Sequence, residues 1–322
     1  VDPSARLAKR AESVSTVSHV FRLKTSKIKV LAKAMRLHQW AKNALLAVPL
    51  LAAHLVLDVH AWVHLALAFL GFGFVASSTY LINDLLDLSS DRQHARKRFR
   101  PLASGALSIP MGLLLAAGSA TTGAMVTLLF LPPVFGAYIA LYIVLTLNYS
   151  FFLKRRLVID VLTLAVLYTL RILAGGVAIG VVVSEWLLMF SLFIFLSLAF
   201  LKRAIELAGA KHSERLAGRG YAPGDRDIVK IMGVSSGLLA VLVLALYVSS
   251  SAVTNLYHSP KILWLMCPLM IYWIARIWFL AERDEVNHDP VVFALFDWRS
   301  YIVGALGLII TLLAKIGVAG VS

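Results

Sequence analysis

The chain contains one cysteine and few acidic residues. Because Cys267 stands alone among 322 residues, this chain holds neither a disulfide framework nor a cysteine-based metal site. Acidic residues number 17 against 31 lysines and arginines, which gives a formal net charge of +14. In a membrane protein, such an excess is typical of cytoplasmic loops and of contact with anionic headgroups or phosphorylated substrates, rather than of nucleic-acid binding.

Hydrophobic residues make up 60% of the chain, and the mean hydropathy is +0.82. A soluble core of this length does not need so much apolar surface, so one long membrane domain is the natural interpretation. The stretch 1–20 has no apolar run and is not a signal peptide. The basic amphipathic stretch 23–36, LKTSKIKVLAKAMR, is expected to lie on the inner membrane surface. We therefore divide the chain into a basic N-terminal arm, 1–36, and a membrane domain, 37–322.

Nine apolar runs approach the length that a membrane-crossing helix needs, about 20 residues. They lie near 41–57, 61–82, 107–131, 133–151, 158–181, 186–201, 228–250, 261–281 and 301–319. Lysine and arginine concentrate in the N-terminal arm and in every second connection, whereas the alternate connections hold almost none. Nine membrane-crossing helices with a cytoplasmic N-terminus would place every basic loop in the cytoplasm, as the positive-inside rule requires.

The segment after the second run, 83–105, places acidic side chains at a membrane boundary. Asn83, Asp87 and Asp91 are spaced i, i+4, i+8, and Asp84 precedes Asp87 by three residues. If the helix continues past the apolar run, all four fall on one broad face. Like charges at this spacing repel, and a divalent cation would reverse that effect. The cluster therefore predicts a Mg²⁺–diphosphate site. A solvated helix end balanced by the following cations is the alternative.

Three of those cations, Lys97, Arg98 and Arg100, stand in KRFRPLASG. Pro101 fixes the backbone after Arg100, and Gly105 permits a tight approach before the third run. Arg98 and Arg100 are therefore expected to point toward the acidic cluster and to grip a phosphate. The alternative is that these cations only enforce membrane topology.

A second charged group follows the basic residues Lys154 and Arg155. Asp160, Tyr168 and Arg171 are spaced i, i+8, i+11 and share one helical face. An arginine so deep in a membrane run costs several kcal/mol unless it is paired or hydrated. We expect Arg171 to face a polar cavity, with a structural Arg–Asp pair as the alternative.

A third group, in LKRAIEL, ends the sixth run. Lys202 and Arg203 lie four and three residues before Glu206. This spacing fits a surface ion pair, and it equally fits a phosphate grip that Glu206 orients. Acidic residues further along the same side are Glu285, Asp289 and Asp297.

At these residues the chain resembles the UbiA superfamily of membrane-embedded transferases. The resemblance runs from LHQWAKN at 37–43 to about residue 315, with NDLLDLSSD as the aspartate-rich motif and YSFFLKR as the basic segment after helix four. It implies an all-α integral membrane protein with nine transmembrane helices around a central cavity. It also implies that Asp84, Asp87 and Asp91 are catalytic and hold Mg²⁺ with a diphosphate.

LKRAIEL stands where the family's aromatic prenyltransferases carry a second motif, DxxxD. Together with KRFRPLASG, DVLTLAVLYTLRILAGG and HDPVVFALFD, it is similar to the decaprenyl-phosphate phosphoribosyltransferase branch. That branch transfers a phosphoribosyl group from phosphoribosyl diphosphate to a polyprenyl phosphate, releases pyrophosphate and serves cell-envelope biosynthesis. The resemblance implies a bacterial inner-membrane enzyme whose active-site mouth is cytoplasmic, compatible with an oligomer.

Within that chemistry the remaining polar side chains would bind the substrates. The acceptor phosphate is already anionic at neutral pH, so no strong general base is required. Catalysis would then come mostly from positioning of the substrates and from electrostatics. The expected substrate-binding residues are Asn83, Arg98, Arg100, Lys154, Arg155, Asp160, Tyr168, Arg171, Lys202, Arg203 and Glu206.

Two other functions are compatible with the sequence. One is prenyl transfer from a polyprenyl diphosphate to a small aromatic acceptor. The other is a membrane transporter or flippase, although charge gathered on one side of the membrane favours an enzyme. Some relatives carry a haloacid-dehalogenase-type phosphatase domain in front. VDPSARLAKRA is similar to the end of such a domain, so the arm 1–36 is interpreted as its tail.

Overall fold

A computed structural model describes residues 10–16, 26–93, 97–209, 219–254, 256–286 and 289–317. Much of the expected N-terminal arm, 1–9 and 17–25, lies outside this part of the chain. In the described residues all regular structure is helical. Eight of these helical segments are long and apolar enough to cross a membrane. An all-α integral membrane protein is thereby confirmed.

The eight long helices match the apolar runs closely. Two extend further than the runs predicted, because α4 continues to Leu86 and α9 to Ala208. The long helices are α4 (Val59–Leu86), α6 (Ile109–Phe130), α7 (Pro133–Phe151), α8 (Ile159–Ala178), α9 (Glu185–Ala208), α10 (Arg226–Val248), α12 (Met266–Glu282) and α14 (Trp298–Ile316). The shorter elements are α2 (Lys27–Ala34), η1 (Leu37–Ala47), α3 (Val48–Ala52), α5 (Leu88–Gln93), η2 (Lys97–Phe99), η3 (Leu153–Arg155), η4 (Pro223–Asp225), α11 (Ser251–Thr254), η5 (Pro260–Leu265) and α13 (Pro290–Phe296).

The predicted count of nine crossing helices is not confirmed, because the first run, 41–57, is not one long α-helix. It folds as the 3₁₀ helix η1 followed by the five-residue α3, and His54 at φ 60° follows the end of α3. A 3₁₀ helix rises about 2.0 Å per residue, against about 1.5 Å in an α-helix. This shorter segment therefore reaches further than its residue count suggests.

The chain divides into two compact units. Unit 1 comprises Val1–Trp40 and Leu67–Gly136, and unit 2 comprises Ala41–Ala66 and Ala137–Ser322.

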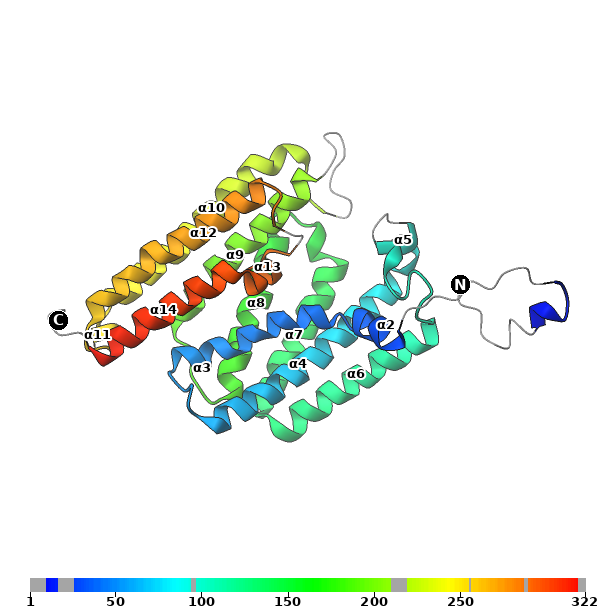
Figure 1. The fold of residues 1–322 in the computed structure, drawn as a ribbon, viewed down its shortest axis with the longest axis horizontal. Coiled ribbons are helices and arrows are strands. Elements are labelled where there is room, and N and C mark those ends of the chain that lie inside the picture. The colour runs from blue at the N-terminus through cyan, green and yellow to red at the C-terminus, as the bar shows by residue number, and fades with distance from the viewer. Residues whose placement is uncertain are drawn as a thin grey trace. The chain divides into compact units, whose positions relative to one another are not determined.

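In unit 1, small residues let α4 and α6 approach closely, and the two helices run side by side in Figure 1. A Cβ atom added at Gly123 would lie 3.0 Å from the carbonyl oxygen of Gly71 and 2.7 Å from a methyl group of Val75. A side chain at Gly123 would therefore force α4 and α6 apart. The buried cluster beside this crossing includes Leu81 and Leu102.

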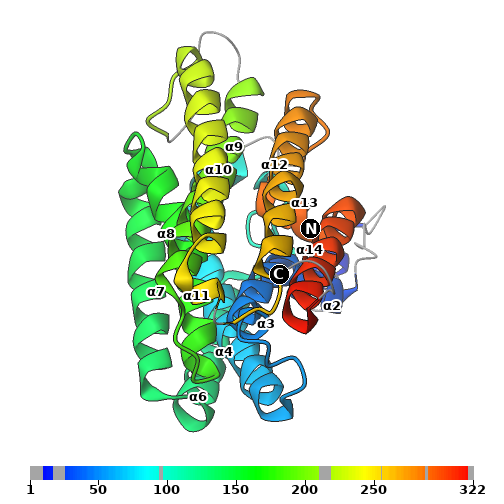
Figure 2. The same cartoon turned by 90° about the vertical axis from the view of Figure 1, so that its left-hand side faces the viewer.

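Unit 2 is built around α9, which packs against α8 and α10, while α10 packs against α12 and α12 against α14. Figures 1 and 2 show α9, α10 and α12 running alongside one another. The core between them is apolar and includes Leu198, Leu201, Ala240 and Ile277. This core fixes the end of α9, from which several of the predicted site residues project.

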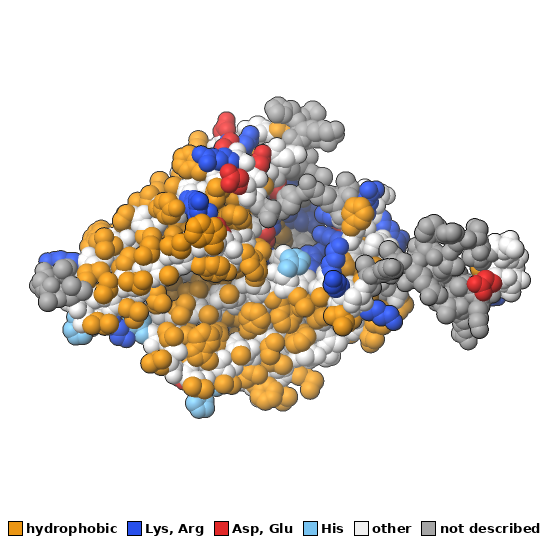
Figure 3. All heavy atoms as spheres, in the orientation of Figure 1, with side chains coloured by type: hydrophobic (Ala, Val, Ile, Leu, Met, Phe, Trp, Pro, Cys, Tyr) orange, Lys and Arg blue, Asp and Glu red, His pale blue; other side chains and the backbone are white. Residues whose placement is uncertain are grey.

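The outer surface of unit 2 is apolar as well. Figure 3 shows hydrophobic side chains covering the visible face along α12 and α14. On α14 the exposed Ile302, Leu306, Ile309 and Leu313 follow helical spacing. Such a stripe would be unfavourable in water but matches the hydrocarbon of a bilayer, in agreement with an integral membrane protein.

Candidate active site

The aspartate-rich segment of unit 1 spans the end of α4 and the short helix α5. The α4 helix ends at Leu86, Asp87 occupies the turn, and α5 begins at Leu88. Asp84 and Asp91 are buried on one side, since seven residues are close to two helical turns. Asp87 is exposed and Asn83 is half-buried. The Asp87 amide donates to the Asn83 carbonyl at 2.9 Å, and the Asp91 amide donates to the Asp87 carbonyl at 2.8 Å, so helical hydrogen bonding continues across this turn. The four side chains keep the expected helical spacing and differ in their burial.

Arg100 joins the two buried carboxylates, as the sequence predicted. Its Nη1 atom lies 3.0 Å from Asp84 Oδ1 and 2.6 Å from Asp91 Oδ2. A second cation, Arg36, places Nη2 2.5 Å from Asp84 Oδ1. Arg98 is exposed in η2, and its guanidinium lies over the neighbouring Phe99 ring. Two arginines therefore neutralise the carboxylate pair, and one of them was not expected.

Whether this pair suits a metal ion can be judged from its oxygen atoms. In the described part of the chain, no group of three or more His, Cys, Asp or Glu side chains is arranged to hold a metal. Mg²⁺, however, usually takes one or two carboxylates and completes its shell with water and substrate phosphates. Among the described residues, the buried Oδ1 of Asp91 has no hydrogen-bond partner. Asp84 and Asp91 thus fit the protein's share of a Mg²⁺ site.

In unit 2, the basic connection between α7 and α8 holds Lys154 and Arg155 in η3. Lys154 is half-buried and Arg155 is exposed. The connection ends at Val158, whose φ of 65° is unusual for a β-branched residue. The two cations are therefore presented by a strained turn rather than by a regular helix.

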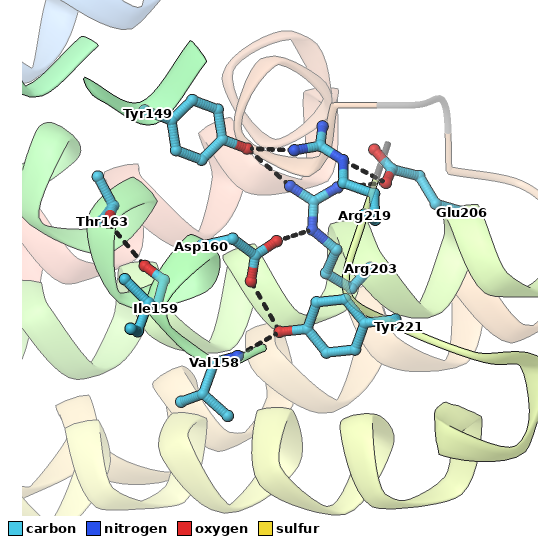
Figure 4. Close-up of polar contacts among 9 residues, drawn as sticks. All are labelled: Tyr149, Val158, Ile159, Asp160, Thr163, Arg203, Glu206, Arg219 and Tyr221. Carbon is cyan, nitrogen blue, oxygen red and sulfur yellow. Dashed lines mark hydrogen bonds and ion pairs between the residues drawn. The ribbon is translucent and has the colours of Figure 1, made fainter. Parts of the chain in front are cut away.

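Asp160 and Arg203 form a wholly buried ion pair in unit 2, drawn in Figure 4. Arg203 Nε donates to Asp160 Oδ2 at 2.6 Å, and both side chains are 0% exposed. Arg203 also donates to the Tyr149 hydroxyl at 2.9 Å and pairs with Glu206. Because its donors are taken up within the protein, Arg203 is better suited to positioning than to direct substrate contact.

Two residues that the sequence analysis did not single out complete this network. The Tyr221 hydroxyl donates to Asp160 Oδ1 at 2.7 Å, and Arg219 donates to the Tyr149 hydroxyl at 2.8 Å. Burial, together with the hydrogen bond to Asp160, raises the pKa of Tyr221 well above its usual value. Tyr221 therefore remains a protonated donor at physiological pH.

A second polar group in unit 2 surrounds Tyr168. The Lys42 ammonium lies 5.6 Å from the centre of the Tyr168 ring, and the Arg171 guanidinium lies 5.8 Å from it. Lys42 pairs with Asp289 at 2.5 Å, and Lys202 lies 3.9 Å from the same carboxylate. Three cations and one carboxylate thus meet here, and these four groups sum to a net positive charge. Neither Lys42 nor Asp289 was predicted as a site residue.

Arg171 is 4% exposed inside α8 and makes polar contacts within the protein, while its place at a polar cavity stays a prediction. It donates to the Leu167 carbonyl at 2.6 Å and, at 3.4 Å, to Asn43 Oδ1 and to the Tyr142 hydroxyl. In the described part of the chain, the buried Nδ2 of Asn43 has no hydrogen-bond acceptor. An unsatisfied hydrogen-bond donor beside cations is suited to binding an anion.

The Asp289 carboxylate makes this group sensitive to acid. Burial alone would raise its pKa, but Lys42 and Lys202 outweigh burial and lower the pKa from 3.8 to about 2. The ionised carboxylate thus contributes about 2 kcal/mol of stability above pH 3.8, which is lost as the pH falls through about 2. We expect the difference in unfolding free energy between the wild type and Asp289→Asn to shrink over that range. Denaturant unfolding in detergent at each pH measures it, and a constant difference would contradict the ion pair.

Comparisons with known proteins bear on what these groups do. The model of the UbiA prenyltransferase family matches residues 44–313. The uncharacterised protein y4nM of Sinorhizobium fredii is 41% identical over 88% of this chain and 55% of its own length. The chain thus spans about half of that relative. The nodulation protein NoeC of Azorhizobium caulinodans is 37% identical over 86% of this chain and 91% of its own length.

A third relative has a named activity. The decaprenyl-phosphate phosphoribosyltransferase of Corynebacterium glutamicum is 39% identical over 54% of each chain. Among solved structures, a UbiA homologue from Archaeoglobus fulgidus bound to GPP and Mg²⁺ has a TM-score of 0.64. It covers 89% of this chain and 100% of its own at 16% identity, so it establishes the fold alone. With a family model that matches most of its length, the chain belongs to the UbiA prenyltransferase family.

Proposed function

We propose that the chain transfers a phosphoribosyl group from phosphoribosyl diphosphate to a polyprenyl phosphate, with Mg²⁺, and releases pyrophosphate. The partial similarity to a decaprenyl-phosphate phosphoribosyltransferase supports this choice. The observation that carries it is the positively charged group around Tyr168 in unit 2, with the unsatisfied donor of Asn43 beside it. An anionic acceptor needs such a group, whereas a neutral aromatic acceptor does not.

The reaction forms one bond and breaks one. An oxygen of the acceptor phosphate attacks the anomeric carbon of the donor, and the bond from that carbon to the pyrophosphate oxygen breaks. The electron pair leaves with pyrophosphate, and no proton has to be removed from the acceptor. Lys42, Lys202 and Arg171 would hold the acceptor phosphate, which fixes its direction of attack.

In unit 1, the carboxylates would serve the leaving group. Asp84 and Asp91, with the exposed Asp87 between them in sequence, would hold Mg²⁺. The ion, when bound, supplies positive charge to the departing pyrophosphate. Arg100 and Arg36 already neutralise the carboxylates, and both would remain beside the diphosphate as further cations.

We also propose the arrangement of the chain in its membrane. The arm 1–36 would lie on the cytoplasmic surface, and 37–322 would form the transferase domain. The basic connections that contain Arg100 and Lys154, and the end of α9 that contains Lys202, would face the cytoplasm of a bacterial inner membrane, because lysine and arginine mark that side. The soluble donor would then reach the site from the cytoplasm and the acceptor from the lipid.

A donor and acceptor comparison tests the proposed reaction. Purified protein in detergent with polyprenyl phosphate lipid should transfer label from phosphoribosyl diphosphate to lipid, and chelation of Mg²⁺ should stop the transfer. The unphosphorylated polyprenol should not act as an acceptor, since it lacks the anion that the group around Tyr168 would bind. Label transfer from a prenyl diphosphate to an aromatic acceptor would instead establish the prenyltransferase alternative.

A further inference from the structure

Three consecutive residues, 219–221, lead toward α10 and contact the end of α7, the connection between α7 and α8, and the start of α8. We call these three residues the clasp. Arg219 donates to the Tyr149 hydroxyl at 2.8 Å, near the end of α7. The Tyr221 hydroxyl accepts from the Val158 amide at 3.2 Å and donates to Asp160 Oδ1 at 2.7 Å, as Figure 4 shows. The clasp therefore spans the whole basic connection, from α7 to the start of α8.

The middle residue of the clasp lies directly on the backbone of that connection. A Cβ atom added at Gly220 would lie 2.7 Å from the carbonyl oxygen of Arg155 and 3.0 Å from the amide nitrogen of Leu157. The φ angle of Gly220 lies outside the left-handed region, so alanine could adopt its conformation. Glycine is therefore required here for close approach and not for its backbone freedom.

The connection needs such support because one of its residues is strained. Val158 has φ 65° and ψ −41°, which a β-branched residue adopts only at a cost. The Val158 amide is hydrogen-bonded to Tyr221, which is itself only 1% exposed. The hydroxyl of Tyr221 is anchored in turn by the buried Asp160. The strained turn is thus hydrogen-bonded, through Tyr221, to the fully buried Asp160–Arg203 ion pair.

We propose that the clasp positions Lys154 and Arg155 to bind a phosphate of the donor. This inference rests on the proposed function, and it gives these two cations, which the sequence predicted to bind substrate, a phosphate of the donor. Gly220 and Tyr221 act through the backbone of the connection and have no contact with substrate. They are therefore positioning residues.

Two glycines of the segment that leads into α10, Gly220 and Gly224, give a matched test. A Cβ atom at Gly220 would collide with the basic connection, whereas a Cβ atom at Gly224 would meet nothing within 4 Å. A spin label at Leu157→Cys, in a Cys267→Ala background, reports the mobility of the connection without any substrate. Gly220→Ala should increase that mobility and raise the donor KM about tenfold with little change in kcat, while Gly224→Ala should change neither. Unchanged label mobility in Gly220→Ala overturns the proposal, as does an unchanged KM despite a looser connection.

A second pair of variants separates positioning from general damage to the fold. Tyr221→Phe removes only the hydroxyl and should likewise loosen the label and raise the donor KM. Adding Val158→Gly removes the strain that this hydroxyl offsets, so the double variant should recover most of the donor affinity. No recovery would contradict the role of Val158. If the wild type transfers no phosphoribosyl group, the proposed function fails. The mobility measurements still test whether the clasp holds the connection between α7 and α8.

Discussion

An Asp87→Asn variant should lose at least about 100-fold in kcat while unfolding at the same temperature as the wild type. Asp87 is the exposed carboxylate of the aspartate-rich segment, in the turn between α4 and α5. Asparagine keeps the size of the side chain and removes its charge. A large loss of turnover without loss of stability would therefore report a missing metal ligand rather than a damaged fold. Mg²⁺ titration of the activity should show a raised requirement for the ion.

The neighbouring Asp91 offers the comparison. Asp91 is 1% exposed and pairs with Arg100 at 2.6 Å, so Asp91→Asn should lower both turnover and stability. Thermal unfolding in detergent separates the two variants, and isothermal titration with Mg²⁺ and pyrophosphate measures ion binding directly. If Asp87→Asn retains wild-type turnover and Mg²⁺ dependence, Asp87 has no part in the metal site.

The long helices could be predicted because a membrane imposes a simple rule. Apolar length alone located the eight long apolar helices of the described residues. The last turns of α4 and α9 were not predicted, because they are polar. The seven-residue spacing of Asp84 and Asp91 also put them on one side, since that spacing follows from the helix itself. The exposure of Asp87 beside two buried carboxylates could not be predicted in this way, because burial depends on tertiary neighbours and not on helical spacing.

The partners of these groups were harder to predict, because they come from distant parts of the chain. Arg36 lies 48 residues before Asp84, and Tyr221 lies 61 residues after Asp160. Lys42 and Asp289 are separated by 247 residues. The strain at Val158 runs against local preference, because valine disfavours positive φ. Such features depend on tertiary packing and leave no periodic pattern in the sequence.

Replacing Arg203 by methionine should destabilise the protein by about 3–5 kcal/mol. Arg203 and Asp160 are both fully buried, so the variant leaves a carboxylate in a low-dielectric interior without its cation. Lys202 is the matched neighbour: its side chain is 23% exposed and lies 3.9 Å from Asp289. Lys202→Met should therefore cost less than about 1 kcal/mol. Denaturant unfolding in detergent micelles measures both changes.

The double variant decides whether the pair is structural. Adding Asp160→Asn to Arg203→Met removes the stranded charge and keeps an oxygen that can accept from Tyr221. It should therefore recover more than half of the lost stability, since the main penalty is the unpaired charge rather than the lost attraction. A substrate-binding arginine predicts the opposite pattern: normal stability for Arg203→Met and a raised KM for one substrate. The buried geometry favours the first outcome, because a guanidinium held by Asp160, Glu206 and Tyr149 has few donors left for a ligand.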